Sequence, residues 1–255
     1  MKNKFTAKFT ALTALSIVLF LGIDSASAKE QEQKEPKILK TEYFTEFYGM
    51  SDDVLIDKAL KGENVDTPHK KVKIKENDEK NEISIEIDKA LSETTFDDGT
   101  VVEDRMKSVS TFVSVEGPYP NSKTSEALTA SSSAKVLMSI SYQSITVGTL
   151  TGYKLSSYSV TPILQDNAFT LTKFQYEARS NGSGYKLDGK SYNTLETTGV
   201  QTISNPVSGT PFSKTLSWVK YNIETGDGFG SGVTGDLWYA RSGTTYRLPF
   251  LITAN

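Results

Sequence analysis

Residues 71–88 read KVKIKENDEKNEISIEID, with polar and apolar side chains alternating in both halves. Alternation with a period of two is typical of a β-strand that has one buried face. The polar residues between the two halves predict the turn of a hairpin. We predict that Val72 pairs with Ile85, which places Lys71 opposite Glu86 and gives both strands one apolar face.

The same alternation recurs along the rest of the chain, at residues 109–115, 136–142, 169–178, 216–223 and 246–252. Its phase slips at Ser144, where a β-bulge or a turn is predicted, and slips a second time at Lys173. The dipeptides Asn181-Gly182 and Asp188-Gly189 predict hairpins. Pro249 favours an edge position for the last strand. Short strands rich in Ser and Thr predict a mainly β fold, an antiparallel β-sandwich or barrel-like domain.

Charge divides the chain at residue 108. Residues 29–108 hold 35 charged residues out of 80, whereas residues 109–255 hold only 20 out of 147 and contain 42 Ser and Thr. We therefore expect a charged, partly helical N-terminal region over 41–108 and a Ser/Thr-rich antiparallel β-domain over 109–255.

The first 28 residues have the three parts of a secretory signal peptide. Lysines at the N-terminus precede the apolar run 11–23, and Ala26-Ser27-Ala28 supplies the small residues of a cleavage site. Residues 29–40 are polar enough to predict a flexible tether. The sequence thus predicts a secreted, extracellular bacterial protein that begins at Lys29, with no integral membrane segment once the signal is removed.

One helix is predicted between Asp52 and Lys61, with Ser51 as its N-cap and Gly62 just beyond its end. In the preceding residues 41–48, aromatic side chains four positions apart predict a second helical turn with an aromatic face.

Composition excludes several classes of protein. The chain has no Cys, which rules out disulfides and thiolate metal sites, and its single His, His69, is interpreted as a surface-loop residue. The net charge of −3 argues against a nucleic-acid partner, which requires a basic face. No sequence pattern predicts a cofactor or a metal.

Residues 226–236 form a glycine-rich segment, predicted to be a mobile ligand loop. It contains G-x-G-x-x-G at Gly230, Gly232 and Gly235, but a strand rather than a helix follows, so a dinucleotide site is rejected. Aromatic residues flank the loop and suit stacking on sugar rings. The candidate ligand-binding residues are Trp218, Tyr221, Phe229, Trp238 and Tyr239.

The sequence favours a non-catalytic binding or structural protein at the cell exterior, with a glycan or another cell-surface component as its partner. One alternative is a secreted hydrolase that uses two carboxylates across a cleft. Its candidate acids in the β-domain are Glu116, Glu126, Asp166, Glu177, Asp188, Glu196, Glu224, Asp227 and Asp236. Another alternative is a β-pore-forming toxin, in which Ser/Thr-rich hairpins insert into a membrane.

Overall fold

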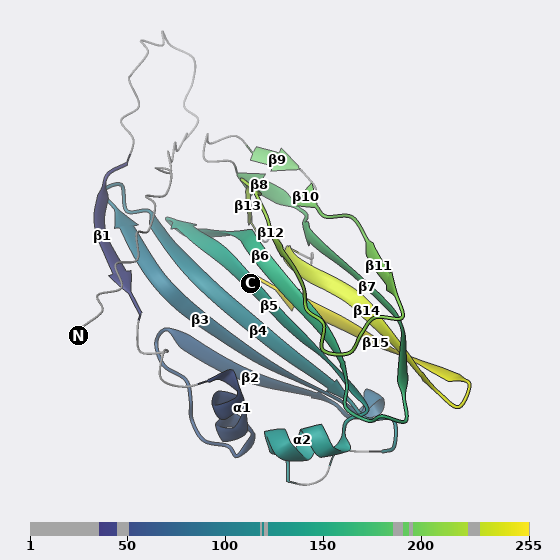
Figure 1. Ribbon diagram of the computed structural model, residues 1–255. Coiled ribbons are helices and arrows are strands. Elements are labelled where there is room, and N and C mark those ends of the chain that lie inside the picture. The colour runs from purple at the N-terminus through teal and green to yellow at the C-terminus, as the bar shows by residue number, and fades with distance from the viewer. Residues whose placement is uncertain are drawn as a thin grey trace, which may run out of the picture.

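The computed structural model describes residues 36–44, 51–117, 119, 122–185, 191–193, 196–223 and 230–254 (Figure 1). The predicted signal peptide, most of the tether and Phe229 lie outside these residues. Within them the chain is mainly β, with antiparallel sheets and two α-helices, α1 (Asp52–Leu60) and α2 (Ser125–Ser131). The predicted β-sandwich class is confirmed.

The larger sheet is built around four long antiparallel neighbours, β3, β4, β5 and β6 (Figure 1). Its path runs β1-β3-β4-β5-β6-β13-β8-β9, while β2 also pairs with β3 and β12 also pairs with β6. The strands are β1 (Ile38–Tyr43), β2 (Lys70–Asn77), β3 (Glu82–Phe96), β4 (Val101–Val113), β5 (Ala134–Val147), β6 (Leu150–Leu164), β8 (Ser183–Tyr185), β9 (Ser191–Asn193), β12 (Phe212–Thr215) and β13 (Tyr221–Ile223).

The smaller sheet follows the path β10-β7-β14-β15, with β11 also pairing with β7. Its strands are β7 (Thr170–Ser180), β10 (Glu196–Thr197), β11 (Gln201–Ser204), β14 (Ser231–Arg241) and β15 (Thr244–Thr253). The strand β15 ends the path and carries Pro249, as the sequence predicts for an edge.

The main core lies between the facing sides of the two sheets. Met138 and Ile140 of β5 belong to one buried cluster with Phe174, Leu237 and Leu248 of the smaller sheet. Burying each such side chain stabilises the fold by roughly 1.5–3 kcal/mol.

A second core lies on the opposite side of the larger sheet. Leu55 of α1 and Leu128 of α2 pack there against Ile85 and Ile87 of β3. The helices therefore cover one part of this outer face, next to β3.

The predicted hairpin exists, but its register differs from the prediction by two residues. Val72 pairs with Ile87 and Ile74 pairs with Ile85, because β2 continues to Asn77 and a 3-10 turn, η1 (Asp78–Lys80), closes the connection. A shift of two residues keeps every apolar side chain on the same face, so hydrophobic alternation alone could not distinguish the two registers.

The helix α1 confirms the prediction for residues 52–61 closely. It spans Asp52–Leu60, and Gly62 adopts φ +77° just beyond its C-terminus. The Ser51 hydroxyl makes no capping hydrogen bond, however, so this end depends on the acidic residues of the first turn.

The segment before α1 differs from the prediction. Residues 38–40 of the expected tether and 41–43 of the expected aromatic helix form the strand β1, which pairs with residues 92–96 of β3. All six residues are exposed, so backbone hydrogen bonds rather than burial hold the strand. Phe44 stacks on His69 with ring centroids 3.7 Å apart.

Only one of the two predicted phase slips coincides with irregular pairing. Burial changes phase at Ser144 as predicted, but the pairing there is regular and the β5–β6 register shifts earlier, between Ser141 and Tyr142. At the second slip, the β7–β14 register shifts opposite Lys173.

Of the two hairpins predicted from turn dipeptides, one is present and the other is not. Strands β8 and β9 pair across the predicted Asp188-Gly189 turn, whose own residues lie outside the described ranges. Asn181-Gly182 instead connects β7 of the smaller sheet with β8 of the larger one, so it is not a hairpin turn. Of residues 216–223, only Tyr221–Ile223 is a strand.

The glycine-rich segment is not a loop from residue 231 onward, because β14 begins there. A Cβ on Gly235 would lie 2.2 Å from the Gln175 carbonyl oxygen, and one on Gly232 would lie 2.2 Å from that of Ile252. These glycines permit close backbone approach inside the sheet, and they do not supply loop mobility.

The change in charge density at residue 108 falls inside β4, so it does not coincide with a break between sheets.

Candidate functional site

The sequence-predicted aromatic residues do not converge on one site. Tyr239 is 1% exposed in the main core, and Tyr221 is 2% exposed in a separate cluster of the larger sheet. The Tyr221 hydroxyl donates a hydrogen bond of 3.0 Å to the Gln143 side-chain oxygen. Trp218 is partly buried and packs against the main core.

Trp238 lies on the outer face of the smaller sheet, where side chains of the protein already contact its ring. The Lys173 ammonium lies 3.6 Å from the ring centroid, and the Arg247 guanidinium lies 5.7 Å from it. Arg247 also donates to both carboxylate oxygens of Asp236 at 2.7 and 2.8 Å. A sugar that stacked on Trp238 would have to compete with these cations.

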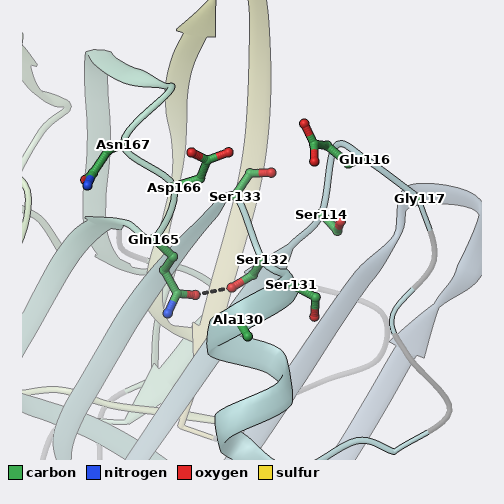
Figure 2. Close-up of a pocket in the computed structure, with 10 residues that line it drawn as sticks. All are labelled: Ser114, Glu116, Gly117, Ala130, Ser131, Ser132, Ser133, Gln165, Asp166 and Asn167. Carbon is green, nitrogen blue, oxygen red and sulfur yellow. Dashed lines mark hydrogen bonds between the residues drawn. The ribbon is translucent and has the colours of Figure 1, made fainter.

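A polar cleft of about 510 Å³ opens at one end of the sandwich (Figure 2). Three segments that are distant in sequence form it: the chain after β4, the C-terminal end of α2, and the connection between β6 and β7. Its lining residues are Ser114, Glu116, Gly117, Ala130, Ser131, Ser132, Ser133, Gln165, Asp166 and Asn167.

The end of α2 positions the serines of the cleft. The helix is capped by Thr124, whose hydroxyl accepts from the Ala127 amide at 3.1 Å, and it ends at Ser131. Extended backbone follows at Ser132, which directs the next residues toward β5. Ser131 therefore ends the helix, while Ser132 and Ser133 line the cleft from the extended chain that follows.

Hydrogen bonds of Ser133 connect the three segments. Its backbone amide donates to the Val113 carbonyl at 2.8 Å, and its carbonyl accepts from the Gln165 amide at 3.1 Å. Its hydroxyl accepts from the Val115 amide at 3.2 Å. Since Ser133 is only 4% exposed, these bonds satisfy polar groups that burial would otherwise leave without partners.

Hydrogen bonds also fix side chains at the end of α2 and in the connection between β6 and β7. The Ser132 hydroxyl donates to the side-chain oxygen of Gln165 (Figure 2). Asp166 accepts from the Ala168 amide at 2.8 Å, a local turn that fixes its carboxylate. The cleft is thus largely preformed.

Glu116 and Asp166 are the two candidate acids that the structure places in this cleft, on either side of Ser133 (Figure 2). Arg241, from the end of β14, makes an ion pair with Glu116 and lies 4.0 Å from Asp166. The hydrogen bond with Glu116 raises the pKa of Arg241, so the guanidinium stays protonated. The positive charge of Arg241 is therefore shared by two carboxylates, so the cleft keeps a net negative charge.

The other described candidate acids lie apart from this cleft. Asp236 is paired with Arg247, and Glu177 accepts a hydrogen bond from Thr197 at 2.5 Å. Glu126 is exposed on α2, and Glu196 lies half-buried in β10. Asp188, Glu224 and Asp227 lie outside the described residues.

In the described part of the chain, no three or more His, Cys, Asp or Glu residues are grouped so that they could hold a metal ion. Among the same residues, none of the helices has the length and apolar character needed to cross a membrane.

Sequence reasoning identified Glu116 and Asp166 only as members of a long list, and it missed Gln165, Arg241 and the serines. The run Ser131-Ser132-Ser133 was a visible signal. No local sequence pattern pointed to Arg241, because its role depends on a contact with Glu116, which is 125 residues away.

No family model, curated protein or solved structure matches this chain.

Proposed function

We propose that this chain is an exported, non-catalytic binding protein that takes a hydroxyl-rich ligand, a glycan, in the cleft beside Ser133. The observation that carries this proposal is the cleft itself, a preformed hollow lined by hydroxyl, amide and carboxylate groups. These groups both donate and accept hydrogen bonds, as neighbouring hydroxyls of a sugar require. A few fixed polar groups in a concave site are the usual means of orienting such a ligand.

The acidic character of the cleft favours a neutral glycan over an anionic one. Carboxylates accept hydrogen bonds from sugar hydroxyls, and bonds to a charged acceptor are roughly twice as strong as neutral ones. An anionic ligand would instead meet the unbalanced charge of Glu116 and Asp166, which share Arg241.

A binding assay on a panel of soluble neutral oligosaccharides tests the proposal by calorimetry. We expect Asp166→Asn and Gln165→Ala each to weaken binding by about tenfold, since each removes or weakens a hydrogen bond to the sugar. Glu126→Gln is the matched control, because Glu126 is a carboxylate on the exposed side of α2. Unchanged affinity in both cleft variants, or no binding to any member of the panel, would refute the proposal.

The hydrolase alternative uses the same two carboxylates. A glycosidase needs one carboxylic acid that gives a proton to the leaving group. Arg241 already holds Glu116 in an ion pair, so this carboxylate would have to leave that contact to reach a leaving-group oxygen. Release of reducing sugar by the natural chain, lost in Glu116→Gln, would establish hydrolysis and overturn the non-catalytic assignment.

A pore-forming role requires apolar strand faces that can reach lipid. The apolar face of β5 instead fills the core shared with the smaller sheet, so insertion would have to open that core. We therefore rank this role below glycan binding.

A further inference from the structure

The face of the larger sheet that points away from the smaller one carries a row of four serines. Ser108 of β4 pairs with Ser139 of β5, which pairs with Ser159 of β6, which pairs with Ser213 of β12. Four adjacent strands thus place one serine each at the same level. In the sequence these residues are up to about a hundred positions apart, so only strand register aligns them.

A second row lies two residues away along the strands. Ser141, Ser157 and Thr215 are directly paired across β5, β6 and β12. We call these two rows the hydroxyl array. Its members lie about 4.8 Å apart across the strands and about 6.8 Å apart along them, the ordinary spacings of a β-sheet. Ser213 and Thr215 are exposed and the other five are half-buried.

A hollow of about 210 Å³ adjoins the array where α1 lies against the sheet. Asp52 of the helix lines it together with Ser108, Ser139 and Ser159. The Ser108 hydroxyl donates to one Asp52 carboxylate oxygen at 3.0 Å, while Lys89 pairs with the other. The array therefore has a concave margin with a fixed carboxylate acceptor, in addition to the exposed Ser213 and Thr215 of β12.

We propose that the hydroxyl array and this hollow bind an extended, uncharged polysaccharide. A serine hydroxyl can both donate and accept hydrogen bonds, and Ser213 already donates to Ser159 at 2.7 Å. The remaining donors and acceptors of the repeated set match a polymer with repeated hydroxyls. The site is separate from the cleft beside Ser133, and the inference does not depend on the function proposed for that cleft.

The charge distribution favours an uncharged chain. No member of the array is charged, and the carboxylates of Asp52 and Asp53 lie at its margin. An anionic polymer such as a nucleic acid would need clustered cations here. A peptide would find apolar side chains such as Met106 and Leu137 in the hollow, but the serine rows outside it provide little area for burial.

The test is co-sedimentation of the full chain with insoluble cellulose, chitin and xylan. We expect binding to at least one of them, and an approximately tenfold rise in Kd for the double variant Ser139→Ala/Ser159→Ala. Ser139→Thr/Ser159→Thr keeps both hydroxyls and is expected to retain binding. The matched control, Ser204→Ala/Thr245→Ala, removes two exposed hydroxyls from the smaller sheet and is expected to bind normally.

Unfolding midpoints of all variants separate lost binding from lost folding. Binding by Ser139→Ala/Ser159→Ala equal to that of the natural chain, or no sedimentation with any of the three polymers, overturns the proposal. A dimer in analytical ultracentrifugation that the same variant abolishes also overturns it, since a second copy would then occupy the face.

Discussion

Trp238 and Tyr239 are neighbours in β14, but their side chains lie on opposite faces of the smaller sheet, so their removal should have very different costs. Tyr239 is 1% exposed, and its ring lies 5.5 Å from that of Tyr246 and 5.6 Å from that of Phe169. Truncating a buried aromatic to alanine leaves a cavity, and we expect Tyr239→Ala to lower the free energy of unfolding by about 3–5 kcal/mol.

Trp238 is held mainly by its two cations. Each cation–π contact at a partly exposed site contributes about 0.5–1 kcal/mol, so Trp238→Ala should lower the free energy of unfolding by roughly 1–2 kcal/mol. Urea unfolding followed by circular dichroism measures both values. A cost for Trp238→Ala equal to that for Tyr239→Ala would refute this account, because it would place the indole in the core.

Three further predictions concern export, packing and pH. N-terminal sequencing of protein from the culture medium should begin at Lys29, and material that retains Met1 would contradict the signal-peptide prediction. Gly235→Ala should destabilise the chain by about 1–3 kcal/mol or more because its Cβ would clash with the Gln175 carbonyl, whereas Gly230→Ala, with open space around it, should be nearly neutral in urea unfolding. Burial raises the pKa of Tyr176 and of Tyr239 to about 12, from 10.0. Their contribution to stability is therefore complete below pH 10 and lost as the pH rises toward 12, and the thermal midpoint should fall over that range, less steeply in Tyr239→Phe.

Local sequence patterns were sufficient to predict the fold class and much of the local structure. Alternation at residues 71–88 predicted the first hairpin, and the phase slip at Lys173 predicted an irregular pairing that the structure shows. These features depend on which face of a strand is apolar, and neighbouring residues alone encode that property. The boundaries of α1 were predictable for a similar reason, since caps and end charges are local.

Other features were decided only when distant segments came together. The register of the first hairpin required the length of its turn, which apolar alternation does not specify. The glycine-rich segment resembled a loop in sequence, yet Gly232 and Gly235 lie inside a strand because neighbouring backbones approach them closely.

The candidate sites depend on the tertiary structure still more. The cleft brings Glu116, Ser133 and Gln165 together from three separate segments, and Arg241 reaches Glu116 from a fourth. The serine row exists only because four strands pair in one register. Composition predicted a Ser/Thr-rich domain but could not say which hydroxyls share a face. The alternation of side chains assigns each residue to one face of its own strand. Its neighbours across the sheet depend on backbone hydrogen bonds between distant segments, which a local sequence pattern does not predict.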